Sequence, residues 1–185
     1  MKFGEEHKLV EARLFEYCPW CASPLVLENC DGRGRFRCPE CDFIWYRNPI
    51  PAAGAIISQG GKILLVKRKY PPKIGDWCFP AGFMEYDESP VQCCLRELRE
   101  ETGLDVKISR LFWVYSGYDD PRSNAVLILF LADINGGRLS PGDDAIDLGF
   151  FDPLQIPANI AFQAHRDAAA DYRKYLDTGQ FPGQF

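Results

Sequence analysis

Apolar and polar positions follow a strand-like pattern along much of the chain beyond about residue 50. Four segments there have the length and apolar content of strands: AAGAIIS, KILLVKRK, RLFWVYSGY and AVLILFLADI. The glycine turn QGG between the first two predicts a β-hairpin. LGFF is a further short apolar segment, and a last helix is predicted over about 160–176. This pattern indicates one globular core.

A helix is predicted between the hairpin and the third strand. The segment before it, YPPKIGDWCFPAG, is too rich in proline and glycine for regular structure. Ser89 is the predicted N-cap, with Pro90 at the first helical position and Gln92 completing a capping box. Gly103 marks the C-terminal end. At 100° per residue, one stripe should face the core, formed by Val91, Cys94, Leu95, Leu98 and Thr102.

Three acidic residues of this helix, Glu97, Glu100 and Glu101, fall together on a flank beside that stripe. Like charges one turn apart destabilise a helix by a few tenths of a kcal/mol. One interpretation is a solvated face on which Arg96 and Arg99 are the local partners. We favour a second, a site for Mg²⁺ or Mn²⁺, because the acids face the edge that the glycine-rich loop approaches.

The N-terminal part contains two matched cysteine pairs. Residues 1–16 are expected to be a short lead-in, and residues 17–47 a small module. Its four paired cysteines are Cys18, Cys21, Cys38 and Cys41. Two Cys-x-x-Cys turns at this spacing favour one structural Zn²⁺ over disulfides or a redox motif. The other four cysteines, Cys30, Cys78, Cys93 and Cys94, are expected to be small buried residues.

The composition and charge of the chain argue against several functional classes of protein. The 185 residues are 46% hydrophobic and 25% charged, with a formal net charge of −5. An acidic chain argues against a protein that mainly coats nucleic acid, so nucleic acid is not the expected partner. The longest uncharged apolar run, AVLILFLA, is too short to span a bilayer. The N-terminal residues do not have the pattern of a signal peptide, so we expect a cytoplasmic protein without membrane partners.

The acidic helix belongs to a longer motif. Gly82 is followed after five residues by Glu88, and after seven more by the segment RELREETGL at 96–104. This motif resembles the Nudix box at every defined position. The resemblance covers about residues 50–180 and implies an α/β fold, a Nudix α/β/α sandwich with a mixed sheet, preceded by a small zinc ribbon with four cysteine ligands. It also implies hydrolysis of nucleoside diphosphates linked to another moiety.

The resemblance implies roles for the motif residues. Glu97 and Glu101 are the leading ligands of the divalent ion, Glu100 supports them, and the Ala81 carbonyl completes the shell. Arg96 orients the glutamates, and Glu88 braces the loop or joins the outer shell. The general base is expected within the motif or in the acidic loop GDDAID, where Asp147 and Asp144 are the candidates.

Substrate contacts are predicted around the loop before the helix. Ala81 and Gly82 belong to this loop, and Trp77 and Phe83 flank it, so their rings could stack on a base or flavin. Packing in the core is the alternative for both rings. Arg47, Lys67 and Arg68 could contact phosphate, although the last two could equally form the solvated end of a strand.

The choice of substrate is expected to lie among dinucleotides. NADH pyrophosphatases carry a further Ser-Gln-Pro-Trp-Pro-Phe-Pro motif, which FWVYSGYDDPRSNAVL replaces here. The chain is more similar to zinc-ribbon Nudix proteins related to FAD pyrophosphatases, so cleavage of FAD to FMN and AMP is the favoured activity. Pro121 weakly favours ADP-ribose. The alternatives are NAD(H), a non-catalytic ADP-ribose or NAD sensor, and an RNA-cap pyrophosphatase. The ribbon is expected to stabilise the domain or a homodimer.

Overall fold

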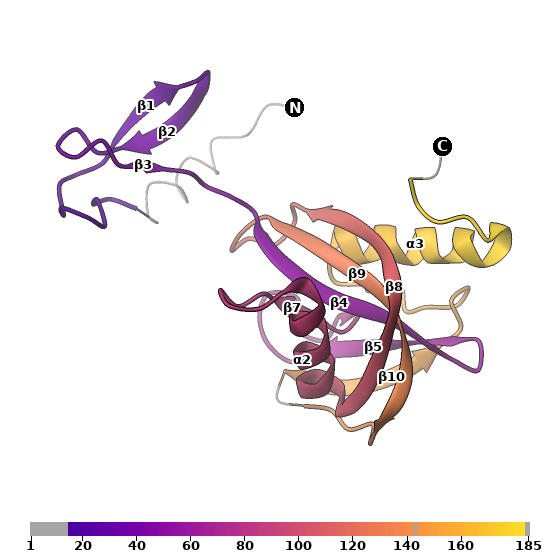
Figure 1. The fold of residues 1–185 in the computed structure, drawn as a ribbon. Helices are drawn as coiled ribbons and strands as arrows, with labels where there is room; N and C mark the ends of the chain where they lie inside the picture. The colour runs from indigo at the N-terminus through magenta and orange to yellow at the C-terminus, as the bar shows by residue number, and fades with distance from the viewer. Residues whose placement is uncertain (1–14, 143, 184–185) are drawn as a thin grey trace. The chain divides into compact units, whose positions relative to one another are not determined.

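The computed structural model describes residues 15–142 and 144–183 (Figure 1). Residues up to Asn48 and residues from Pro49 onward form two compact units. Only the last two residues of the lead-in expected over residues 1–16 lie within the described part. Neither described helix is long and apolar enough to cross a membrane.

The first unit is a small antiparallel sheet. Its strands lie in the order β1 (Val26–Cys30), β2 (Arg33–Arg37) and β3 (Ile44–Trp45). Asp31 and Gly32 connect β1 to β2 with positive φ angles of 54° and 78°. Glycine adopts such angles without steric cost, which explains the tight reversal here. The strands β1 and β2 therefore form a hairpin.

The second unit is built on a mixed seven-stranded sheet. Five strands lie in the order β10-β5-β4-β9-β8, while β6 pairs with β5 and β7 pairs with β4. The strands are β4 (Ile50–Gln59), β5 (Lys62–Arg68), β6 (Trp77–Cys78), β7 (Ala81–Phe83), β8 (Leu104–Gly117), β9 (Ala125–Gly137) and β10 (Ala145–Phe151). Among the strand pairs described for this sheet, only β4–β9 is parallel. The short strands β6 and β7 lie in the segment that was predicted to be irregular.

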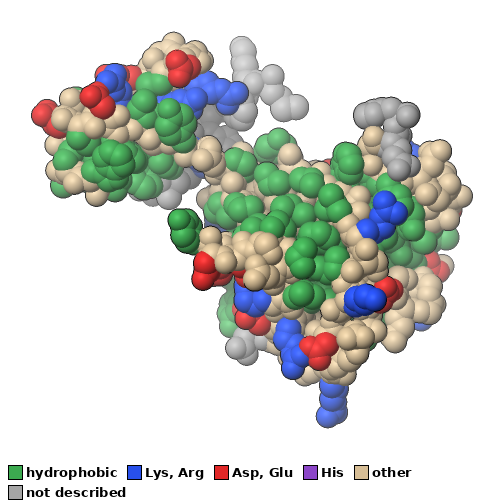
Figure 2. Space-filling model, viewed as in Figure 1, with side chains coloured by type: hydrophobic (Ala, Val, Ile, Leu, Met, Phe, Trp, Pro, Cys, Tyr) green, Lys and Arg blue, Asp and Glu red, His purple; other side chains and the backbone are tan. Residues whose placement is uncertain are grey.

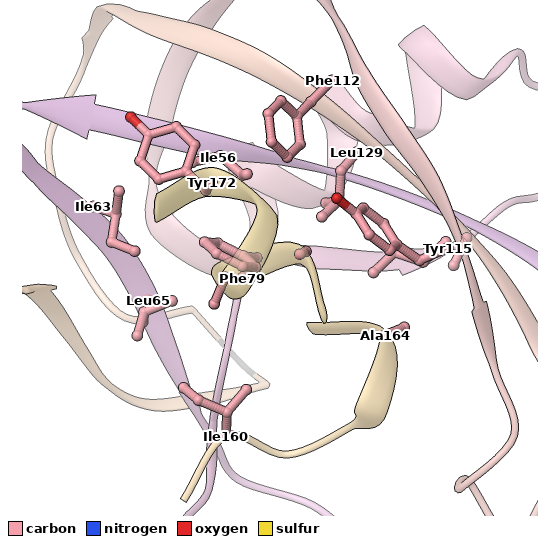
Figure 3. Close-up of a cluster of buried hydrophobic side chains, with 14 residues drawn as sticks. Ile56, Ile63, Leu65, Phe79, Phe112, Tyr115, Leu129, Ile160, Ala164 and Tyr172 are labelled. Atoms are coloured by element: carbon pink, nitrogen blue, oxygen red, sulfur yellow. The ribbon is translucent and has the colours of Figure 1, made fainter. Parts of the chain in front are cut away.

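One helix covers each face of this sheet (Figure 1). Successive residues of a strand point to opposite faces. Ala55 and Ile57 therefore pack against α2 (Pro90–Thr102), while Ile56 packs with α3 (Gln163–Thr178). Figure 3 shows the α3 side, where Phe112 and Tyr172 meet edge to face with centroids 5.9 Å apart. The predicted α/β/α sandwich is confirmed.

Helix α2 begins and ends at the predicted residues. Ser89 Oγ accepts a hydrogen bond from Gln92 N–H, and the Gln92 side chain accepts one from Ser89 N–H. Gly103 ends the helix with φ 70°. Because these interactions lie within a few residues of one another, the local sequence alone specifies them.

The buried stripe of α2 is rotated from the predicted one. Cys93 is fully buried and its thiol faces the Gly82 carbonyl oxygen at 3.5 Å. Val91 and Leu95 were predicted to face the core, but they are 42% and 38% exposed. The strands β7 and β4 contact α2 from the Cys93 side, which turns the other flank toward solvent. Figure 2 shows hydrophobic side chains on the face of this unit where α2 and β8 lie.

Helix α3 begins three residues later than predicted. Ile160 forms a parallel bridge with Trp77, and Ala161 N–H donates to the Trp77 carbonyl oxygen at 2.8 Å. Because Ile160 and Ala161 pair with Trp77 in this strand-like way, the helix begins only after them. Phe162 at the N-cap offers no side-chain acceptor, and Asp119 instead accepts the hydrogen bond of Gln163 N–H.

Candidate active site

The guanidinium group of Arg96 organises the acidic helix. Its Nη1 atom donates to Glu97 Oε1 at 2.7 Å and to Glu100 Oε2 at 3.0 Å. Its Nε and Nη2 atoms donate to the two oxygens of Glu88 at 3.0 and 2.6 Å. Nη2 also donates to the Phe83 carbonyl oxygen at 3.1 Å. One cation therefore offsets three carboxylates and connects the helix to the loop before it.

Glu88 also braces this loop. Its Oε1 atom accepts the backbone N–H of Glu85 at 2.8 Å, and only 12% of its side chain is exposed. The hydrogen bonds from Arg96 are the largest cause that lowers the pKa of Glu88 to about 2. Glu88 is therefore ionised throughout the physiological pH range, and both of its carboxylate oxygens accept hydrogen bonds from other groups of the protein.

Gly82 allows Glu97 to lie against the loop. A Cβ atom on residue 82 would lie 2.1 Å from Glu97 Cδ. No ordinary side chain could occupy that space without displacing the carboxylate. The Glu97 side chain is 15% exposed, and burial is the main reason why its pKa is raised.

Glu101 is the most enclosed acid of the cluster. Its Oε2 atom accepts a hydrogen bond from the backbone N–H of Ala81 at 3.0 Å. The group of Ala81 that contacts this candidate metal ligand is therefore its N–H. Burial raises the pKa of Glu101 to about 8, and the neighbouring charge of Glu97 acts in the same direction. A divalent cation at this position would offset both unfavourable effects.

These acids line an open cleft of about 450 Å³. Its lining residues are Glu97, Glu100, Glu101, Gly142 and Asp144. Gly142 was not recognised from the sequence; its N–H donates to the Glu101 carbonyl oxygen at 3.0 Å. A Cβ atom there would lie 1.7 Å from the Glu100 carbonyl oxygen. Glycine thus brings the acidic loop against the end of α2.

The two candidate bases have different positions. Asp144 lines the cleft with the three glutamates. Asp147 lies in β10 opposite Lys67 of β5, is exposed, and accepts the N–H of Leu148 at 2.9 Å. The structure therefore brings Asp144, and not Asp147, to the acidic cluster.

A second cavity, of about 100 Å³, lies next to β7. Ala81, Gly82 and Phe83 all line it. It also contains polar residues that were not singled out from the sequence as substrate contacts: Asp119, Asp120, Arg122 and His165. These residues come from the β8–β9 connection and the start of α3, far from the motif in sequence, so no local pattern identifies them.

The two aromatic residues that were predicted to contact the substrate, Trp77 and Phe83, lie in different environments. Phe83 lines the small cavity, and the Arg122 guanidinium carbon lies 5.8 Å from its ring centroid. Trp77 packs edge to face against Phe151, with centroids 4.8 Å apart, and is not among the residues lining either cavity. Arg47 belongs to the first unit. Of the two predicted aromatic contacts, the structure therefore places Phe83, and not Trp77, in the small cavity.

The four paired cysteines form one cluster in the first unit. The Sγ atoms of Cys18, Cys21, Cys38 and Cys41 all lie within 4.8 Å of one another. The pairs Cys18–Cys41 and Cys21–Cys38 are separated by 3.5 and 3.4 Å. Four thiolates at about 2.3 Å from a tetrahedral Zn²⁺ would be roughly 3.8 Å apart, so this donor set fits zinc.

Comparison with known proteins agrees with the fold and the motif. A family model described as "NUDIX domain" matches residues 48–176. The chain therefore belongs to the Nudix family. Within that family it is a Nudix pyrophosphatase whose relatives include ADP-ribose and NAD-capped RNA hydrolases.

Two curated proteins and one solved structure show how similar this chain is to known proteins. "ADP-ribose pyrophosphatase" of Methanocaldococcus jannaschii is 41% identical over 131 residues, covering 70% of this chain and 76% of the relative. "NAD-capped RNA hydrolase NudC" of Chromobacterium violaceum is 32% identical over 158 residues, covering 82% of this chain but 57% of the relative. A crystal structure of a NUDIX hydrolase from Nitrosomonas europaea aligns with TM-score 0.77 and 34% identity, covering 90% of this chain and 94% of that one.

Proposed function

We propose that this chain hydrolyses the pyrophosphate bond of ADP-ribose, with Mg²⁺ or Mn²⁺, to AMP and ribose 5-phosphate. The observation that carries the proposal is that β7 (Ala81–Phe83) adjoins both sites. Its three residues line the small cavity, and its Ala81 N–H donates to Glu101 of the acidic cleft. A substrate with a ring or sugar in the cavity would place its phosphates against the glutamates. The 41% identity to a protein named ADP-ribose pyrophosphatase supports this substrate.

The glutamates fit a hard divalent cation. Glu97 and Glu101 are carboxylates held in a desolvated position, and both have raised pKa values because of burial. Oxygen donors of this kind suit Mg²⁺ or Mn²⁺. When bound, such an ion offsets charge on the phosphoryl oxygens and lowers the pKa of a bound water. Glu97, Glu101 and the outer Glu100 would hold the metal.

The remaining residues position these ligands and move the proton. Arg96 fixes the carboxylates of Glu97 and Glu100, and Glu88 fixes Arg96. Asp144 lines the same cleft, so we assign to it the removal of the proton from the attacking water. Phe83 and Arg122 would contact the moiety in the small cavity.

The four cysteines would hold one structural Zn²⁺, because their thiols already surround a single centre. The ion would tie the two Cys-x-x-Cys turns together in a unit that is too small for a large core. The homodimer expected from the sequence remains a prediction, which light scattering tests.

A second candidate substrate is NAD(H) or an NAD-capped RNA end. The likeness to the protein named NudC covers 82% of this chain and so includes part of the cysteine unit. FAD, favoured by the sequence analysis, ranks behind both, since neither curated relative described above is named for it. A sensor without turnover is the remaining alternative.

The test is hydrolysis of ADP-ribose, NADH, NAD-capped RNA and FAD, each with Mg²⁺ or Mn²⁺, with products resolved by chromatography. We expect AMP and ribose 5-phosphate to appear fastest from ADP-ribose. E97Q and E101Q should each lower kcat by about 100-fold or more, because each loses one metal-ligand charge. E85Q is the matched control, since Glu85 is exposed and its hydrogen bonds with Glu88 are made by its backbone N–H and carbonyl groups. Binding of ADP-ribose without turnover of any substrate would favour the sensor.

A further inference from the structure

Arg68 lies where the acidic cleft and the small cavity approach each other. It is the last residue of β5 and is paired with Ala145 at the start of β10. The next residue, Lys69, donates its N–H to the carbonyl oxygen of Asp144 at 3.0 Å. The backbone of Arg68 is therefore held beside Asp144, which lines the cleft, while its side chain lines the small cavity.

Backbone acceptors hold the Arg68 side chain in one place. Its Nε atom donates to the Pro72 carbonyl oxygen at 3.0 Å, and Nη2 faces the Tyr70 carbonyl oxygen at 3.4 Å. The guanidinium carbon lies 4.9 Å from the ring centroid of Phe162. The group is thus positioned by the loop after β5 and by an aromatic face.

Arg68 is close to acidic groups that feel its charge, Asp120 among them, but it is not in a salt bridge with any carboxylate of the described residues. Arg122, the other arginine of the cavity, differs in that Asp120 binds it at 2.7 and 3.0 Å. A fixed arginine that keeps donors free from carboxylates is suited to bind an anion from solution.

The charge of Arg68 acts within the small cavity. Arg68 and His165 both line it. Burial lowers the pKa of His165 to about 3, and the positive charge of Arg68 acts in the same direction.

We propose that Arg68 binds the phosphate group that the substrate places on the cavity side of the scissile bond. The identity of the full substrate rests on the proposed function, but the contact itself requires only a phosphate next to the cavity. Lys67, its neighbour, has a different environment, because its Nζ atom lies 5.7 Å from the ring centroid of Trp77. The two basic residues at the end of β5, which sequence alone does not distinguish, thus lie in different environments.

The test measures binding and not turnover, so its result does not depend on the proposed hydrolysis. Titration calorimetry with the full chain and Mg²⁺ compares AMP with adenosine, and ribose 5-phosphate with ribose. We expect at least one phosphorylated probe to bind more tightly than its phosphate-free partner. R68M should weaken that probe about 10- to 100-fold, a typical effect of losing a charged hydrogen bond, and leave the phosphate-free partner unchanged.

Two further variants, R68K and K67M, make the test more specific. R68K should retain part of the preference for phosphate, because the charge remains without the planar donor pair. K67M is the matched control and should leave the preference intact. If R68M does not fold, R68Q replaces it, because its amide can still donate a hydrogen bond to a nearby carbonyl. The proposal is wrong if the wild type prefers neither phosphorylated probe, if the preference survives loss of Arg68, or if K67M removes it equally.

Discussion

Gly82 and Glu97 are in such close contact that the glycine's missing side chain determines where the glutamate carboxylate can lie. A Cβ on residue 82 would be 2.2 Å from each carboxylate oxygen of Glu97. The glycine belongs to β7 and the glutamate to α2, so this contact sets the separation of the strand from the helix. A position that requires glycine is thereby linked directly to a proposed metal ligand.

G82A is therefore expected to damage activity more than stability. The added methyl group meets the end of a flexible side chain, which can move away at small cost, but the carboxylate then leaves its position. A displacement of about 1 Å at a reacting centre can cost roughly 100-fold in rate. Steady-state kinetics and thermal unfolding of the variant measure the two effects.

G136A is the control for G82A, because a Cβ on Gly136 meets its nearest neighbour at an ordinary 3.7 Å. G136A should behave like the wild type in both assays. Unchanged kcat in G82A would show that the position of Glu97 does not limit the reaction.

The placement of the two loop aspartates predicts different effects. D144N should lower kcat by about 100-fold or more if Asp144 accepts the proton from water, which is the usual range for a general base. D147N should have little effect, because Asp147 is exposed on β10. Rates of both variants at several pH values provide the measurement, and a larger loss in D147N than in D144N would reverse the assignment.

The cysteine cluster predicts about one zinc ion per chain in purified protein. C38S should lower the zinc content and loosen the first unit, because three thiolates hold the ion less tightly than four. C30S is the control, since Cys30 is outside the cluster. Elemental analysis and hydrogen exchange of residues 15–48 report both effects; protein that is purified without any zinc would contradict the assignment.

His165 predicts a loss of stability in acid. The residue is buried, and its Nδ1 atom accepts the N–H of Phe79 at 3.2 Å. Burial lowers its pKa from 6.5 to about 3. Between these values the unfolded chain binds the proton and the folded chain does not, so the free energy of unfolding falls as pH decreases from 6.5 toward 3.

H165N keeps a side-chain acceptor near Nδ1 but cannot titrate. It should therefore lose less stability between about pH 7 and pH 4.5 than the wild type, even if it is less stable at neutral pH. Urea unfolding at several pH values measures the slopes. Equal slopes for the two proteins would show that His165 is not responsible for the acid sensitivity.

Interactions between close neighbours in sequence were predictable. The capping box of Ser89 and Gln92 and the C-terminal Gly103 specify α2, because the hydrogen bonds that end a helix involve residues at most a few positions apart. Cysteine spacing likewise predicted the cluster in the first unit. Apolar runs and the glycine turn QGG predicted the main strands, since both signals are local.

Features that depend on packing between distant segments were not predictable. The exposure of Val91 and Leu95 follows from which flank of α2 meets the sheet. The difference between Asp144 and Asp147 follows from where the acidic loop meets the end of α2.

The sequence by itself therefore determined the family motif, the ends of its helix and the metal-type donors. Only the tertiary structure decided which side chains line the small cavity near this motif. Arg68, Arg122 and His165 line one cavity although nearly a hundred residues separate the first from the last. Their proximity results from the pairing of strands and the packing of α3, and no local pattern of residues encodes such long-range contacts.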